Sequence, residues 1–392
     1  MKRPHILIVG GGIGGLTTAL ALAKIGISSS VLEQASQFRV EGAGIQFCPN
    51  TFKVLDYLGI ANKFAEVAFF PELLCYRDGI TGREYIRLPL GQDIVDRFNH
   101  PFGSFRRDDM LRVFVEACQK ESLIQLFTDA KIKAIEETQD KVFATASNEK
   151  KYEGDVLVGS DGIWSISRKY VMGMDSPRVS GQIIYRGVVK RDAMPDGLDL
   201  DNIVHYVIPN AHLVHYPIGK NGFINISAIF QSDRMPDYRE SQGNPRELFS
   251  WFDGASEKVK EILKHVDVTR MWTLCDYNPS RNWSKGRVVL LGDSAHATLP
   301  YMTSGAGMAV EDAIVLAKMI DTHGLEYKSA FKAYEEERYI RTSYVQYLSR
   351  AYGEAHHATG VAREVRNEYL SHWSVEETYN WVSYLYSGIS LK

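Results

Sequence analysis

The chain has 392 residues, 45% of them apolar and 24% charged, which is the composition of a globular protein with a sizeable core. Its formal net charge of −3 provides no basic surface for nucleic acid, and no apolar run approaches the roughly 20 residues of a membrane span. The four cysteines are widely spaced, so they predict neither a zinc site nor a redox pair but free thiols in a reducing cytoplasm.

A glycine motif joins the first two expected elements. "HILIVG" (5–10) predicts a buried strand and "GGLTTALALAKIG" (14–26) a helix, with Gly10, Gly12 and Gly15 in GxGxxG spacing between them. In this pattern the first glycine permits a tight turn, the second lets a pyrophosphate approach the backbone, and the third lets the helix pack against the strand. The helix N-terminus would add free N–H groups and a partial positive charge. The motif therefore predicts a phosphate-binding turn.

The next strand ends at a carboxylate. "SSSVLEQ" (28–34) places Glu33 about 20 residues after the glycines, where a carboxylate accepts hydrogen bonds from ribose hydroxyls. A negative group here would repel a 2′-phosphate, so we do not expect a bound NADP. NAD and FAD both carry an ADP moiety, and this site is consistent with either.

In the middle of the chain the residue pattern changes to one that predicts short strands. "DVLVGSDGIWSISR" (155–168) predicts a strand that runs into Asp161-Gly162. Short alternating strands follow over 180–275, and segment 70–100 is expected to add strands to the same antiparallel sheet. A helix is predicted over 245–266.

A third strand end follows in "RVVLLGD" (287–293). Asp293 is a candidate acceptor for ligand hydroxyls, and the Gly305–Gly307 amides, before a helix that opens near Met308, are candidate binders of an anion or carbonyl. Residues 311–368 are expected to be mainly helical, with one long amphipathic stretch over 334–352.

Together these motifs resemble the class A FAD-dependent aromatic hydroxylases of the para-hydroxybenzoate hydroxylase type, over nearly the whole chain. "GAGIQFCPN" (42–50), "RDGITGREYIRLPLG" (77–91) and "HHATGVAREVRNEYL" (356–370) are similar to the 3-hydroxybenzoate 6-hydroxylase, salicylate hydroxylase and 6-hydroxynicotinate 3-monooxygenase subgroup. The resemblance implies that the bound dinucleotide is FAD.

It also implies roles for the motif residues. Asp161-Gly162 would lie near the pyrophosphate and take part in FAD and NAD(P)H binding, Gly292-Asp293 would bind the ribityl chain, and Arg107 in "FRRDDM" would contact FAD from a helix start. No metal is expected. The residues expected at the cofactor are Gly10, Gly12, Gly15, Glu33, Arg107, Asp161, Gly292, Asp293, Pro300, Gly305, Ala306 and Gly307.

The expected fold is α/β: a Rossmann-like FAD-binding domain of the glutathione-reductase type, with an inserted antiparallel-sheet substrate domain and a helical C-terminus. We expect the FAD-binding domain to take 1–70, 101–179 and 276–340, the substrate domain 71–100 and 180–275, and the C-terminal helical segment 341–392.

The resemblance implies the reaction as well. In this family NADH or NADPH reduces FAD, and O2 then forms a flavin hydroperoxide that attacks a ring carbon made electron-rich by a hydroxyl group. No separate nucleotide-binding domain is evident, so NAD(P)H, with NADH favoured, is expected to bind only transiently. The expected substrate is a small phenol or hydroxylated heteroaromatic, with a hydroxybenzoate-like acid favoured. Because the family often forms dimers, a homodimer is a further expectation.

The strand "AHLVHYPIG" (211–219) supplies candidate catalytic residues. Alternation places His212 and Tyr216 on one face and His215 on the other. His212 and Tyr216 match positions that face substrate in the resembling hydroxylases, and His212 is the candidate base for the phenolic proton. Tyr301, after Pro300, is the third candidate.

Some positions depart from the subgroup. In 3-hydroxybenzoate 6-hydroxylase a catalytic Gln stands where this chain has Tyr301, and the 6-hydroxynicotinate enzyme has His at the positions of Tyr301 and Gln46. The substrate therefore stays open. Arg186 and His296 match positions that are more often structural.

Two other interpretations remain. One is another flavin-dependent reaction, such as an oxidase, dehydrogenase or epoxidase, or oxidation of a larger polycyclic or non-carboxylated substrate. The other is a flavin- or NAD-binding module without turnover, against which the intact Asp161-Gly162 pair argues.

Overall fold

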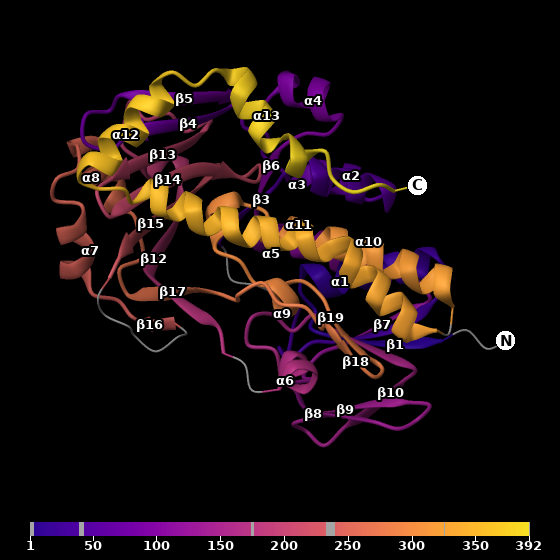
Figure 1. Cartoon of the computed structure of the whole chain (residues 1–392). Helices are drawn as coiled ribbons and strands as arrows, with labels where there is room; N and C mark the ends of the chain where they lie inside the picture. The colour runs from indigo at the N-terminus through magenta and orange to yellow at the C-terminus, as the bar shows by residue number, and fades with distance from the viewer. Residues whose placement is uncertain (1–3, 39–42, 174–175, 233–239, 325, 392) are drawn as a thin grey trace.

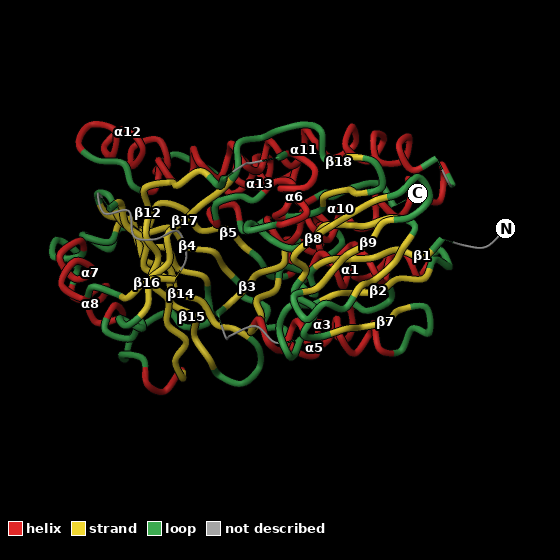
Figure 2. The backbone as a smooth tube through the Cα atoms, turned by 90° about the horizontal axis from the view of Figure 1, so that it is seen from below, coloured by secondary structure: helices red, strands yellow, loops and turns green. Residues whose placement is uncertain are grey.

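The structure is a computed structural model that describes residues 4–38, 43–173, 176–232, 240–324 and 326–391. Two large sheets lie side by side, with most helices packed around the first (Figures 1 and 2). The first sheet has six strands in the spatial order β18 (Ser284–Lys285), β19 (Val288–Leu290), β11 (Val156–Gly159), β1 (His5–Val9), β2 (Ser28–Leu32) and β7 (Ile124–Phe127).

All neighbours in this sheet are parallel except β18 and β19. Its central strands are apolar because both faces are covered. The helices of this half are α1 (Ile13–Lys24), α2 (Pro49–Tyr57), α3 (Ala61–Val67), α5 (Arg107–Gln119), α6 (Ile166–Met172), α9 (Asp293–His296) and α10 (Gly305–His323). A small sheet of β8 (Ile132–Glu137), β9 (Val142–Ala146) and β10 (Lys151–Gly154) flanks it.

The second sheet has eight strands in the order β16 (Glu240–Gln242), β17 (Arg270–Asp276), β12 (Arg178–Lys190), β15 (Phe223–Gln231), β14 (Ala211–Ile218), β13 (Ile203–Ile208), β4 (Leu73–Asp78) and β5 (Glu84–Pro89). Every pair is antiparallel except β13 with β4. Segment 70–100 thus adds two strands and α4 (Gln92–Phe98), and a two-stranded pair, β3 (Gly44–Phe47) and β6 (Gly103–Arg106), lies between the sheets.

The long helix α11 (Tyr327–His356) runs from the first sheet to the second, and α12 (Gly360–Ser371) and α13 (Val375–Tyr386) follow it (Figure 1). The predicted α/β fold with an antiparallel second sheet and a helical C-terminus is confirmed. The division at the expected domain boundaries stays a prediction. Among the residues that the structure describes, no helix has both the length and the apolar character needed to cross a bilayer.

One element differs from the prediction. The helix expected over 245–266 is two helices, α7 (Pro245–Trp251) and α8 (Glu257–Leu263). An Asp-Gly pair at 253–254 interrupts the pattern, and a new helix begins after Ser256. Glycine is a poor helix former, so the chain turns there, although the apolar spacing continues.

Candidate active site

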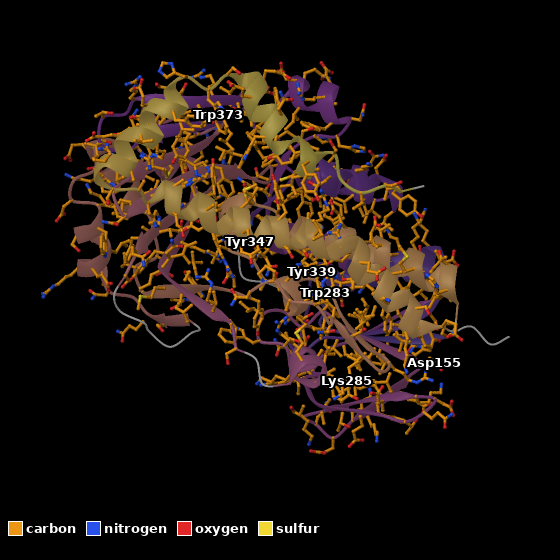
Figure 3. The ribbon with its side chains drawn as sticks, viewed as in Figure 1. Asp155, Trp283, Lys285, Tyr339, Tyr347 and Trp373 are labelled. Carbon is orange, nitrogen blue, oxygen red and sulfur yellow. The ribbon has the colours of Figure 1, made fainter. Side chains whose placement is uncertain are left out.

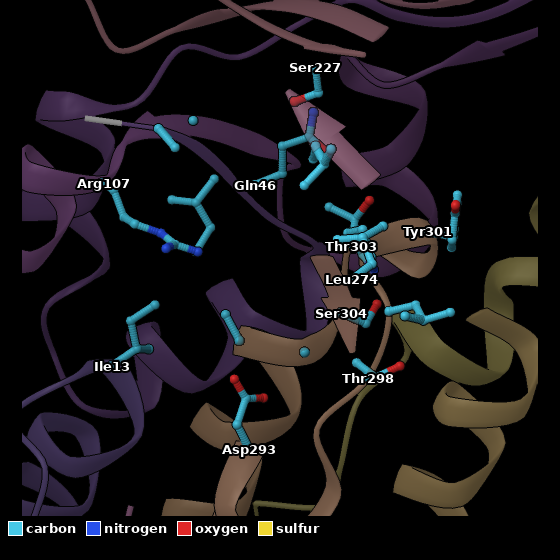
Figure 4. Close-up of a pocket in the computed structure, with 18 of the residues that line it drawn as sticks. Ile13, Gln46, Arg107, Ser227, Leu274, Asp293, Thr298, Tyr301, Thr303 and Ser304 are labelled. Atoms are coloured by element: carbon cyan, nitrogen blue, oxygen red, sulfur yellow. The ribbon is translucent and has the colours of Figure 1, made fainter. Parts of the chain in front are cut away.

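A cavity of about 550 Å³ is lined by loops that follow strands of the first sheet and by strands of the second sheet. One part of its wall comes from the turn between β1 and α1, the start of α5 and the loop after β19. The other comes from β12, β14 and β15 of the second sheet. Figure 4 shows side chains from these separate segments converging on the cavity. A ligand bound there would contact both halves of the molecule.

The three glycines of the first motif have separate structural roles. Gly10 has φ of 105°, and a Cβ on it would collide with the carbonyl oxygen of Ser160. A Cβ on Gly15 would collide with the carbonyl of Gly10, so α1 packs directly against the turn. A Cβ on Gly12, which lines the cavity, would meet nothing within 4 Å. Of the three glycines, only Gly12 borders space that no protein atom fills, as expected where a ligand approaches the backbone.

Glu33 follows β2 and supports this turn. Its Oε2 accepts a hydrogen bond from the Gly11 amide at 2.8 Å, and its Oε1 accepts one from the Ala35 amide at 2.8 Å. The carboxylate is therefore fixed beside the glycine turn, just outside the cavity wall. Each oxygen has a second lone pair, so acceptance of ribose hydroxyls stays a prediction.

Asp161 is directed away from the cavity. Its carboxylate accepts hydrogen bonds from the Ser165 hydroxyl at 2.5 Å and from the amides of Ile166 and Ser167 at 2.8 and 3.0 Å. It thus caps α6, although burial raises its pKa. Its neighbours Ser160 and Gly162 line the cavity instead. Asp161 shapes this loop, and a direct cofactor contact through its side chain stays untested.

The loop after β19 contributes most of the other predicted positions. Gly292, Asp293, Pro300, Gly305 and Ala306 all line the cavity, the last two in the first turn of α10. No described residue donates a hydrogen bond to the Asp293 carboxylate, which faces the cavity (Figure 4), and burial raises its pKa. Gly307 lies behind the wall, where a Cβ would come within 2.7 Å of the Thr51 hydroxyl.

A buried charge cluster holds this loop in place. Asp312 in α10 accepts a hydrogen bond from the Gly292 amide, lies 2.6 Å from His296 Nε2, and pairs with Arg338 at 2.6 Å. Burial would raise the pKa of Asp312, but His296 and Arg338 outweigh it and hold the pKa at about 2. The His296 ring also packs on Trp283, which lies near Tyr339 of α11 (Figure 3). His296 is thus structural, as expected.

Two arginines lie at the cavity from opposite sides. Arg107, the first residue of α5, extends into it (Figure 4), and its buried Nε has no hydrogen-bond partner among the described residues. Arg186 lies on β12, where burial and the charge of Arg107 lower its pKa to about 10. Neither has a carboxylate partner in the described ranges, so the pair would favour a ligand with anionic or carbonyl oxygens.

The candidate catalytic residues lie on β14. His212 and Tyr216 line the cavity, and burial raises the pKa of Tyr216 to about 12. His215 faces the other way, with Nε2 2.8 Å from the carbonyl oxygen of Asp199. Burial, and after it the neighbouring His356 and His357 imidazoles, hold the pKa of His212 well below its usual range. The imidazole is therefore neutral at neutral pH.

Tyr301 completes this end of the cavity. It lies in a short 3₁₀ turn (Pro300–Met302), and its ring centroid is 5.5 Å from that of His212. Its hydroxyl donates to Gln182 Oε1 at 2.6 Å. The structure thus brings His212, Tyr216 and Tyr301 to one cavity.

A family model described as "FAD binding domain" matches residues 3–346. The chain belongs to this family. It is 34% identical over 381 residues to a 3-hydroxybenzoate 6-hydroxylase of Polaromonas naphthalenivorans, covering 97% of this chain and 95% of the relative. It is 28% identical to a 6-hydroxynicotinate 3-monooxygenase of Bordetella bronchiseptica, covering 88% and 91%.

Klebsiella pneumoniae HpxO, crystallised with FAD and uric acid, has the same fold. The two structures share a TM-score of 0.87 at 23% identity, over 98% of this chain and 97% of the other. The family match and the 3-hydroxybenzoate 6-hydroxylase relative identify this FAD-binding protein as an FAD-dependent monooxygenase of the class A aromatic hydroxylases, as the sequence predicts.

The cavity fits the cofactor of the FAD-binding family. The clear space at Gly12 and the unpartnered buried Nε of Arg107 suit a phosphate-bearing ligand, and the unbonded Asp293 carboxylate suits hydroxyl donors. Within the described ranges no group of side chains could hold a metal ion.

Sequence reasoning missed several residues of this family member's site. His205, His356 and His357 surround His212, and Gln182 joins His357 to Tyr301. Alternation along 202–209 could have identified His205, because it is opposite Val214 in the sheet register. No local signal links His356, the last residue of α11, or His357 after it to β14.

Proposed function

We propose that this protein hydroxylates a small phenolic or hydroxylated heteroaromatic acid, using FAD, NADH or NADPH, and O2. The observation that carries the proposal is that one cavity joins the FAD-type wall at Gly12, Arg107 and Asp293 to His212 and Tyr216 on the second sheet. A cofactor held at the first wall would have its substrate beside the second.

The chain's own residues would hold FAD along the first wall. Gly12 and the α1 N-terminus would take the pyrophosphate, Glu33 the ribose, and Asp293 the ribityl hydroxyls. The first-turn amides of α10 at Gly305 and Ala306, with Arg107, would offer donors to carbonyl or phosphate oxygens. FAD supplies the oxidising chemistry, by accepting electrons from NAD(P)H and activating O2.

His212 would then prepare the ring for attack. A phenol becomes a better nucleophile when its proton is shared with or taken by a base. His212 is buried and neutral at neutral pH, so it has the free base form that this step requires. Tyr216, whose raised pKa keeps its hydroxyl protonated, would donate a hydrogen bond to the substrate.

The substrate class rests on the relatives. The names of the two relatives above specify 3-hydroxybenzoate and 6-hydroxynicotinate, both hydroxylated aromatic acids. A hydroxybenzoate-like acid is our first candidate and NADH the favoured reductant. Arg186 and Arg107 are the cations at the cavity that a substrate carboxylate could approach.

A substrate panel tests the proposal. Purified FAD-loaded protein would be mixed with hydroxybenzoates, hydroxypyridines and larger phenols, under NADH or NADPH and ¹⁸O2. We expect nicotinamide oxidation to rise with one small hydroxylated acid, and one ¹⁸O atom to enter the product. A product only from larger phenols would select the polycyclic alternative. Peroxide without product from every compound would contradict hydroxylation.

The assembly and location are also proposals. Cys48, Cys75 and Cys118 are buried and unpaired, which suits the reducing cytoplasm predicted from the sequence. Ile340 and Tyr347 on α11 are 63% and 60% exposed and offer an apolar face for the predicted homodimer. Light scattering during gel filtration would decide between monomer and dimer.

A further inference from the structure

A chain of hydrogen bonds leads away from His212 into the protein. His212 Nδ1 lies 2.8 Å from His357 Nε2, and His357 Nδ1 lies 3.4 Å from Gln182 Nε2. The Oε1 of the same amide accepts from the Tyr301 hydroxyl at 2.6 Å. All four side chains are at least 91% buried, so these contacts are shielded from water. Neither Gln182 nor His357 lines the cavity.

The hydrogen bonds of this series can run in only two directions. A neutral imidazole has one N–H donor and one acceptor nitrogen, so the direction of one of its hydrogen bonds fixes the direction of the other. The amide ends the series: its NH2 group only donates, and its oxygen only accepts. The orientation of Gln182 therefore decides which nitrogen of His357, and then of His212, carries the proton.

In the orientation of the structure, the Gln182 NH2 group donates to His357 Nδ1. His357 then carries its proton on Nε2 and donates to His212 Nδ1, so His212 presents an N–H at Nε2. With the amide turned over, its oxygen accepts from His357 Nδ1–H, and its NH2 group donates to the Tyr301 oxygen. His357 Nε2 then accepts from His212 Nδ1–H, and His212 presents a lone pair at Nε2.

Two other histidines, His356 and His215, lack this freedom. His356 Nδ1 lies 2.8 Å from the carbonyl oxygen of Tyr352, and His215 Nε2 lies 2.8 Å from that of Asp199. A carbonyl only accepts, so each of these rings is held in one tautomer. Among these paired rings, only the His212–His357 pair takes its direction from a side chain that can turn.

We propose that Gln182, acting through His357, sets which ring nitrogen of His212 carries the proton, and thereby whether His212 accepts or donates a proton in the cavity. The inference rests on the proposed function: in the orientation of the structure His212 would donate a hydrogen bond into the cavity, and only with the Gln182 amide turned over could it accept the proton of a phenol. Gln182 and His357 are positioning residues, and Tyr301 is the last member of the hydrogen-bond series.

Gln182→Glu tests the direction, because a carboxylate only accepts. It would require N–H at His357 Nδ1; with His357 neutral, its Nε2 then accepts from His212 Nδ1–H and leaves the lone pair of His212 at the cavity. We expect ¹⁵N spectra of histidine-labelled, FAD-loaded protein to show the His212 proton on Nε2 in the wild type and on Nδ1 in Gln182→Glu. An unchanged His212 tautomer beside a His357 ring that the same spectra show to be neutral would overturn the proposal.

Substitutions of His357 provide a second test if Gln182→Glu does not fold. His357→Leu removes the partner of His212 Nδ1, whereas His357→Gln places an amide where Nε2 stood. We expect product per NADH to fall about tenfold or more in the first and to recover in the second, with flavin content unchanged. His215→Gln, on the opposite face of β14, is the matched control. Equal product from His357→Leu and the wild type would overturn the proposal.

The two hypotheses fail separately. If the wild type hydroxylates nothing in the panel, the proposed function is wrong, but the ¹⁵N shifts still decide whether Gln182 controls His212. If the wild type hydroxylates a phenol while these variants behave like it in both measurements, only this inference is wrong.

Discussion

At the scale of single residues, burial decides the state of the groups in the cavity. His212 is 2% exposed and lies against three other imidazoles, so a positive charge on its ring is disfavoured. Tyr216 is held protonated by the same loss of water. One strand face therefore presents a neutral nitrogen and a hydroxyl side by side.

Removal of the imidazole tests the proposed base. We expect His212→Ala to slow product formation by about 10²-fold or more, because the phenol would keep its proton during ring attack. Flavin content should not change, since His212 lies on the second sheet. Rapid-reaction spectroscopy with product counting would measure both. Product per NADH equal to that of the wild type would remove His212 from the mechanism.

Gly12 tests the cofactor wall. In Gly12→Val the added side chain would project into cavity space that no protein atom occupies within 4 Å of a Cβ. We expect folded protein that has lost most of its FAD, measured by flavin absorbance against circular dichroism. Gly254→Val is the matched control, because a Cβ there also meets nothing and the φ of neither glycine is positive. Full flavin in Gly12→Val would place the pyrophosphate elsewhere.

At the scale of elements, α10 anchors the loop that presents Asp293. Its Asp312 side chain joins the Gly292 amide, His296 and Arg338 in a site without water access. A buried pair of this kind is costly to break, because the remaining charge has no solvent to replace its partner. The position of Asp293 thus depends on α10 and α11 together.

The pKa of Asp312 predicts acid sensitivity. It is about 2 in the folded protein against 3.8 for a free side chain, so the group stabilises the fold above pH 4 and loses that contribution as pH falls toward 2. The contribution is about 2 kcal/mol. Urea unfolding at several pH values should show that the free energy of unfolding falls less between pH 4 and pH 2 in Asp312→Asn than in the wild type. An equal fall in the two proteins would contradict this role of Asp312.

The local elements could be predicted because their signals are local. The β1–α1 turn follows from the spacing of Gly10, Gly12 and Gly15, and the two faces of β14 follow from strict alternation. The break between α7 and α8 was missed because apolar spacing continues across the Asp-Gly turn at 253–254.

The histidine cluster could not be predicted from the sequence. His212 and His357 are 145 positions apart, and their contact exists only because α11 ends beside β14. Similarly, nothing local indicates that the Tyr301 hydroxyl donates to Gln182, 119 residues away, instead of pointing into the cavity. Long-range packing, which has no period along the chain, places these groups.

At the scale of the whole molecule, a buried carboxylate joins two strands of the second sheet to α11. Asp276, at the end of β17, is fully buried and accepts from Arg178 of β12 at 2.8 Å and from Arg350 of α11 at 2.7 Å. Because both arginines depend on one acid, its loss would leave two cations without their partner. The cluster ties the long helix to the second sheet.

Neutralisation of this acid should weaken the whole fold. We expect Asp276→Asn to lower the free energy of unfolding by about 3 kcal/mol or more, because an amide cannot offset two guanidinium charges. Chemical denaturation monitored by flavin and tryptophan fluorescence would measure it. Asp253→Asn, at an exposed turn, is the control. An unchanged unfolding midpoint in Asp276→Asn would show that α11 is held by its other contacts.

Helix α11 connects the two ends of the candidate site. It is about 45 Å long at 1.5 Å per residue, with Arg338 paired to Asp312, which holds the Asp293 loop, and His356 beside His212. Each added residue turns a helix by about 100°. One extra residue between Arg338 and His356 would thus leave the Asp293 loop supported while turning His356 and His357 to another side of the helix axis. The length of α11, as much as the identity of its residues, therefore sets how the Asp293 loop and His212 are placed relative to each other.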